Sequence, residues 1–89
     1  MNAIITVVGN DKVGIIAQVS AFLAGRNINI EDISQTVLSG SFVMMMMVDL
    51  SASTQALEAV KAELSALGDS MGVSISLMHE KVFSAMHRI

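Results

Sequence analysis

A polar loop between two apolar segments carries the residues of this chain best suited to bind a ligand. The loop reads Gly9-Asn10-Asp11-Lys12-Val13-Gly14 and lies where a strand-like run changes to a helical pattern. A helix start exposes unpaired backbone N–H groups and a partial positive charge, so it can bind a carboxylate or a phosphate. Asp11 can accept from an ammonium group or cap the helix, and Lys12 can neutralise an anion. The same residues also suit a plain strand-to-helix turn, and their types leave both interpretations open.

Two other sets of residues are of types that bind metal ions, but their positions favour a structural role. The run Met44 to Met47 offers thioethers, which are soft ligands for Cu(I). In a strand, however, alternate side chains point to opposite faces, so the run is more typical of core packing. His79 and His87 are expected to be solvated or locally hydrogen-bonded rather than metal ligands. Since no nucleophile lies beside a base at a recognisable spacing, we expect no catalytic residues, no metal, no cofactor and no enzyme.

Composition narrows the classes of partner. Five basic and eight acidic side chains give a net charge of −3, and Trp and Tyr are absent, which argues against binding nucleic acid by bulk charge or base stacking. The longest apolar run, Phe42 to Val48, is far shorter than the ~18 to 20 residues that cross a bilayer. A signal peptide would require a basic residue before its apolar segment, and no basic residue precedes Ala3. The chain also has no cysteine. These features predict a cytoplasmic protein without a membrane partner.

The spacing of apolar residues predicts seven elements in one chain of 89 residues. Ser51 to Thr54 offer oxygens to cap the second helix, and Gly72 is expected to end it. The apolar positions between 28 and 38 change parity, which predicts a bulge near Glu31-Asp32. The expected elements are a strand at 3–8, a helix at 14–26, an extended segment at 28–38, a strand at 42–50, a helix at about 57–71, a strand at 73–78 and a terminal helix at 80–89.

This order predicts an α+β fold, a ferredoxin-like βαββαβ sandwich. Right-handed crossovers place the first and third strands in the centre of a four-stranded antiparallel sheet and both helices on one face. The third strand is apolar on both faces, so the other face must meet the tail, a second subunit or a ligand. We therefore expect a domain at 1–80 and a C-terminal helical extension at 81–89, which packs on the sheet or on the partner of a homodimer.

The chain carries motifs of the ACT domain family, and the resemblance covers nearly its full length. The matching residues are Gly9-x-Asp11-Lys12-x-Gly14-Ile15-Ile16 and Asn27-Ile28-Asn29-Ile30-x-Asp32-Ile33. The chain looks most like the small stand-alone ACT proteins of bacteria and the N-terminal ACT modules of the glycine cleavage transcriptional repressor and formyltetrahydrofolate deformylase. One departure is Val13, because the family often has Pro at that position.

What the resemblance implies is a regulatory domain that pairs side by side and often binds an amino acid at the dimer interface. One wall of the implied site is the first loop with the helix start, and the opposing wall is the beginning of the second strand. An amino acid needs carboxylates for its ammonium group, which Asp11 and Asp32 supply, and N–H donors for its carboxylate. The implied ligand-binding residues are Asn10, Asp11, Lys12, Val13, Gly14, Ile15, Asn29, Asp32, Ile33 and Ser34. The alternative is a protein–protein interaction or dimerisation module with no ligand.

Overall fold

The structure, a computed structural model, describes residues 1–10 and 14–86. Within these ranges four strands and three helices follow one another in the order that the sequence predicts. The elements are β1 (Asn2–Gly9), α1 (Ile15–Gly25), β2 (Asn29–Leu38), β3 (Ser41–Asp49), α2 (Leu57–Met71), β4 (Ser74–His79) and α3 (Glu80–Met86).

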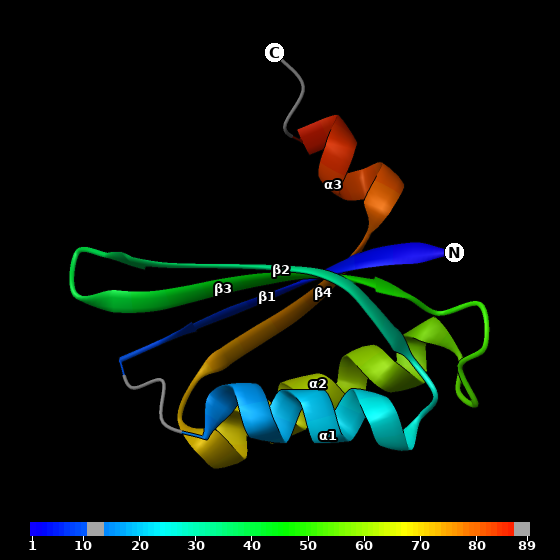
Figure 1. Cartoon of the computed structure of the whole chain (residues 1–89), viewed down its shortest axis with the longest axis horizontal. Helices are drawn as coiled ribbons and strands as arrows, with labels where there is room; N and C mark the ends of the chain where they lie inside the picture. The colour runs from blue at the N-terminus through cyan, green and yellow to red at the C-terminus, as the bar shows by residue number, and fades with distance from the viewer. Residues whose placement is uncertain (11–13, 87–89) are drawn as a thin grey trace.

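The four strands form one antiparallel sheet in the order β2-β3-β1-β4. Helices α1 and α2 lie together on one face of the sheet, and α3 stands on the other, as Figure 1 shows. The predicted ferredoxin-like fold is therefore confirmed, with β1 and β3 in the centre. We call the face that carries α1 and α2 the helix face, and the opposite one the open face.

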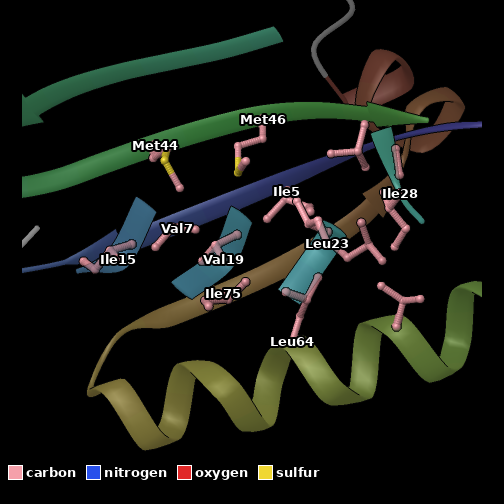
Figure 2. Packing of buried hydrophobic residues seen from close by; sticks show 14 of the residues in the cluster. Ile5, Val7, Ile15, Val19, Leu23, Ile28, Met44, Met46, Leu64 and Ile75 are labelled. Atoms are coloured by element: carbon pink, nitrogen blue, oxygen red, sulfur yellow. The ribbon is translucent and has the colours of Figure 1, made fainter. Parts of the chain in front are cut away.

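Alternation along β3 assigns its side chains to the two faces. Met44 and Met46 are 0% exposed, whereas Met45 and Met47 are half-buried. Figure 2 shows Met44 and Met46 pointing from β3 into the cluster that α1, α2 and the sheet share. The expectation that the methionines pack in the core holds for these two, while the other two lie on the open face.

The predicted bulge is also confirmed, and it explains the change of parity in β2. Ile30 pairs with Val48 and Asp32 pairs with Met47, so Glu31 is the extra residue. One extra residue reverses which positions face the helices. Ile30 and Ile33 consequently lie on the same face although one number is even and the other odd. The hairpin that follows turns at Ser39 and Gly40, both with positive φ, as a tight two-residue turn requires.

The helix ends agree with the sequence at their C-termini and differ at one N-terminus. Gly72 ends α2 in the left-handed conformation, with φ of 71°, as predicted. The N-cap of α2 is Ala56, which makes no side-chain hydrogen bond, so the expectation that Ser51 to Thr54 cap this helix is wrong. The Ser53 hydroxyl accepts instead from the Gln55 N–H at 3.1 Å, within the turn before the helix. Local side-chain bonds of this kind compete with capping.

A polar cluster around Arg26 joins the end of α1 to α2. The Arg26 guanidinium donates to Glu63 Oε1 at 2.7 to 2.8 Å and to Gln55 Oε1 at 2.9 Å. It also lies 3.6 Å from the centre of the Phe22 ring, a cation–π contact. These contacts hold the two helices in one orientation against the sheet, at the end of α1 that leads into β2.

Arg26→Ala is expected to lower the free energy of unfolding by about 1 to 2 kcal/mol, because it removes the ring contact and these hydrogen bonds together. The hydrogen bond from Arg26 holds the pKa of Glu63 below its usual value. A carboxyl group whose pKa is lower in the folded state than in the unfolded state stabilises the fold at pH values above its unfolded pKa. This stability is lost as the pH falls through the folded pKa.

Denaturant unfolding between pH 6 and pH 3 measures both effects. The wild-type chain should lose more stability than Arg26→Ala below about pH 4. Parallel curves for the two proteins would contradict the assigned role of Glu63. Lys61→Ala is the matched control, because Lys61 is an exposed basic residue on α2, the helix that carries Glu63.

Helix α3 follows β4 directly and contacts the strands β1 and β4. It rises from the open face in Figure 1 instead of lying along it. Val82 is 51% exposed and Phe83 is half-buried, so these two side chains differ in burial. His87 and Ile89 lie outside the described residues. No helix in the described part of the chain is long and apolar enough to span a bilayer.

Candidate ligand-binding site

The first loop joins β1 to α1 at the end of the sheet near the β2–β3 hairpin. Asn10 is exposed, and Asp11, Lys12 and Val13 lie outside the described residues. Gly14 is the N-cap of α1, with φ of 76°, and it supplies no side chain to cap the helix. No acidic residue lies in the first turn of α1. Among the described residues, no side chain caps the start of the helix, where backbone N–H groups and a partial positive charge favour an anion.

Only the backbone of Ile15 is available to the implied site. Its side chain is 2% exposed and packs in the core beside Val19 and Val7, as Figure 2 shows. The N–H of Gln18 donates to the Gly14 carbonyl at 2.9 Å, which closes the first turn of the helix. The core contact of Ile15 thus fixes where the start of the helix points.

The opposing wall is the first half of β2, an edge strand. Asn29, Asp32 and Ser34 pair with Asp49, Met47 and Met45 and so face the open side of the sheet. Ile33 pairs with Met46 and faces the helix side. Asp32 Oδ1 accepts from the Ile33 N–H at 2.9 Å, which leaves its second oxygen for another donor. The implied residues of β2 are therefore divided between two faces of one strand.

The register shows that the two walls do not meet within one chain. Gly9 pairs with Phe42, which pairs with Val37, so the end of β1, where the first loop begins, lies level with the end of β2. Asp32 lies level with Ile4, five positions away along β1. At about 3.4 Å per residue, some 17 Å separate the loop from Asp32 along the strand direction. A single chain therefore presents two half-sites.

The outer side of β2 is well placed to join another chain. From Glu31 to Leu38 every residue of β2 is exposed, including Val37 at 64% and Leu38 at 66%. A long edge strand with unpaired backbone groups and apolar side chains is a template for pairing with a further strand. This edge carries the second half-site, and its end is level with the end of β1, with β3 between the two strands.

Two surface hollows among the described residues lie beside α2, away from the residues of β2 in the second half-site. One is lined by Leu57, Lys61, Leu77, Met78 and Val82, and another by Ser65, Asp69, Gly72 and Ser74. Both lie beside α2 and β4, at the opposite edge of the sheet from β2. Neither hollow is lined by any of the loop and strand residues that the ACT resemblance implies.

His79 and the acidic residues form no metal centre among the described residues, since no group of three His, Asp or Glu side chains comes together there. His79 Nδ1 accepts from the Lys81 N–H at 3.0 Å, at the start of α3. This local bond matches the interpretation of His79 as a locally bonded side chain.

Sequence reasoning did not single out the Arg26 cluster, because its partners are 29 and 37 residues away.

Comparison with known proteins agrees with this fold. The profile of the ACT domain family matches residues 2–78, and the chain therefore belongs to the ACT domain family. The matched stretch ends in β4, so α3 lies beyond it.

Relatives of the same length are similar over the whole chain. UPF0237 proteins of Listeria monocytogenes serotype 4b and Clostridium acetobutylicum are 49% and 52% identical over 89 residues, which is 100% of each chain. An ACT domain protein from Streptococcus pneumoniae has a solved structure with 40% identity and a TM-score of 0.82, with 100% of this chain and 97% of that one covered.

A more distant likeness extends to parts of larger proteins. A formyltetrahydrofolate deformylase from Pseudomonas syringae has a TM-score of 0.77 at 23% identity, with 86% of this chain and 26% of that one covered. A putative glycine cleavage system transcriptional repressor has the same TM-score and identity, with 85% and 44% covered. At this level of identity the likeness shows the fold alone.

Proposed function

We propose that this chain is a cytoplasmic, non-catalytic regulatory module that binds an amino acid between the two subunits of a homodimer. The observation that carries the proposal is the separation of the half-sites within one chain, together with the exposed edge of β2. A site with walls about 17 Å apart needs a second copy to close it.

Antiparallel pairing of two β2 strands supplies that closure. If the two-fold axis passes near Ile33 and Ser34, Asp32 of the second copy lies beside Gln35 of the first. The start of one β2 then lies next to the end of the other, at the end of the sheet where β1 also ends. Two equal sites result, each made of one loop and one strand start, as isologous pairing requires.

The residues of this interface suit the two charged groups of an amino acid. The N–H groups at the start of α1 are donors for a carboxylate. The free oxygen of Asp32 is an acceptor for an ammonium group, with Asp11 as a second acceptor. Ligand in both sites would favour one arrangement of the subunits, and this population shift is the signal to a partner protein.

A thermal-shift and calorimetric screen against the twenty amino acids at millimolar concentration tests the proposal. A free ligand at one hundred times its Kd should raise the free energy of unfolding by about 2.7 kcal/mol. Glycine is the first to try, because a structural neighbour is titled a glycine cleavage system repressor. Asp32→Asn should raise Kd at least about tenfold, because it removes a charged hydrogen bond.

Glu58→Gln is the matched control, since Glu58 is an exposed carboxylate on α2 and should leave Kd unchanged. The proposal fails if no amino acid stabilises the chain, or if the two variants weaken binding equally.

A dimerisation and protein-interaction module without a ligand is the second candidate. The exposed side chains of Val37 and Leu38 at the hairpin tip favour it, because apolar side chains on a protruding turn are suited to bury against another protein. Retention of a partner protein by both wild type and Asp32→Asn, in the absence of any amino-acid binding, would support this function.

A further inference from the structure

Strand β4 is the second edge of the sheet, and no described strand pairs with its outer side. It runs from the end of α2 to the start of α3, as Figure 1 shows. Natural edge strands often carry a lysine, a proline or a bulge that prevents pairing with a further strand. From Ser74 to Met78, β4 has none of these, and its register with β1 is regular. The outer backbone groups of β4 are therefore a template for one more strand.

Two hollows lie along this edge, one at each end of β4, and α2 borders both. The Asp69 hollow has a volume of about 360 Å³ and is lined by Ser65, Asp69, Gly72, Val73, Ser74 and Ile75. The Leu57 hollow has a volume of about 260 Å³ and lies between α2, the end of β4 and Val82 of α3. Small-molecule sites enclose roughly 300 to 1,000 Å³, so hollows of this size suit single side chains of a peptide.

The Asp69 hollow carries a negative charge that the chain itself does not balance. Among the described residues, none donates a hydrogen bond to the Asp69 carboxylate or forms an ion pair with it. Asp69 also lies in the last turn of α2, where the helix has a partial negative charge and no basic side chain. A carboxylate at this end of a helix is unfavourable without a counter-charge. The hollow therefore favours a basic side chain from outside.

The Leu57 hollow is mainly apolar. Its apolar side chains come from α2, β4 and α3, and they are Leu57, Leu77, Met78 and Val82. Val82 is 51% exposed and Leu57 is half-buried, so both have surface left to bury. Glu58 and Lys61 also line the hollow, and their charges are opposite. This hollow therefore favours an apolar side chain.

The spacing of the two hollows matches the repeat of an added strand. Ile75 lines the Asp69 hollow and Leu77 lines the Leu57 hollow, and both side chains are buried on the helix face. Directly opposed residues of two paired strands place their side chains on the same face. Residues two positions apart in an added strand, about 7 Å from each other, therefore lie beside one hollow each.

We propose that β4 binds an extended segment of a partner protein as a fifth strand, with an apolar side chain in the Leu57 hollow and a basic side chain beside Asp69. In the antiparallel direction, which is slightly more stable, the segment meets Leu77 before Ile75. The segment therefore reads an apolar residue, any residue, and then a lysine or an arginine. Strand addition at β4 is the contact of the module with the protein that it regulates.

The occupant is another protein because a second copy would not close the assembly. The proposed function already uses the β2 edge to pair two copies, and pairing through β4 as well would extend the sheet without limit. A basic segment also complements a chain of net charge −3. The choice of occupant thus rests on the proposed function, whereas the free edge and its two hollows do not.

Selection of peptides from a random phage library on the full chain tests the proposal. The selected peptides should share an apolar residue followed two positions later by lysine or arginine. A synthetic peptide with this pattern should bind at least about tenfold more tightly than the same peptide with aspartate as the third residue of the pattern. N-methylation of two adjacent peptide nitrogens should abolish binding, because one of any two successive N–H groups in a strand faces its neighbour.

Asp69→Lys should reverse the preference, so that the aspartate peptide binds at least about tenfold more tightly than the lysine peptide. Asp69 is exposed, and the variant is expected to fold. Glu31→Lys is the matched control, since Glu31 is an exposed carboxylate on β2, at the opposite edge of the sheet. It should keep the preference of the wild type.

The proposal is overturned if no peptide is selected, or if Asp69→Lys and Glu31→Lys show the same preference. Binding that survives N-methylation would overturn strand addition. Wild-type association beyond a dimer that Asp69→Lys reduces would assign the β4 edge to a second copy, which also overturns the proposal. Asp32→Asn should lose amino-acid affinity and keep peptide binding, so this contact and the proposed function can fail separately.

Discussion

Replacing Met46 by alanine should lower the free energy of unfolding by about 2 to 4 kcal/mol, the largest single-site loss that we predict. Met46 is 0% exposed, and its side chain lies in the cluster shared by β1, α1 and α2. Alanine removes that contact and leaves a cavity that the close-packed sheet and helices cannot fill. Urea denaturation at a protein concentration too low for association measures the loss.

Met45→Ala is the matched control, because the residue type, the strand and the deletion are the same. Met45 is half-buried on the open face, and its truncation in the isolated chain should cost less than about 1 kcal/mol. Similar losses for the two variants would contradict the division of the methionine run between two faces.

Gly68→Ala should lower the free energy of unfolding by about 1 to 3 kcal/mol, because it overpacks the contact between α2 and β4. A Cβ atom at Gly68 would lie 2.8 Å from the Val73 carbonyl oxygen and 3.0 Å from Ile75 Cγ1. The Val73 N–H also donates to the Gly68 carbonyl at 2.9 Å, so the backbone here has little room to move. Helix α2 must shift away from the strand to admit the methyl group.

Gly25→Ala is the control for this change. Gly25 is also helical, and no atom lies within 4 Å of a Cβ placed there. Alanine is the better helix former, so this variant should be unchanged or more stable by up to about 1 kcal/mol. Thermal unfolding followed by circular dichroism compares the two variants. Stability of Gly68→Ala equal to that of Gly25→Ala would show that α2 is free to move.

The amino-acid sequence by itself determined the elements and their order. Apolar spacing predicted the strands and helices, and the parity change near Glu31 predicted the bulge that the register contains. Gly72 marked the end of α2 because its conformation is one that other residues rarely adopt. The cap of α2 was missed, because Ser53 has an equally local alternative partner in Gln55.

The tertiary structure alone decided which residues lie together. Motif residues at the first loop and in β2 look like two walls of one site, yet the register places them about 17 Å apart in one chain. The Arg26 cluster and the direction of α3 were likewise outside the reach of local patterns. Periodicity reports the face on which a side chain lies, and this depends on near neighbours in the chain. Distance across a sheet depends on strand order and register, which the packing of the whole chain sets.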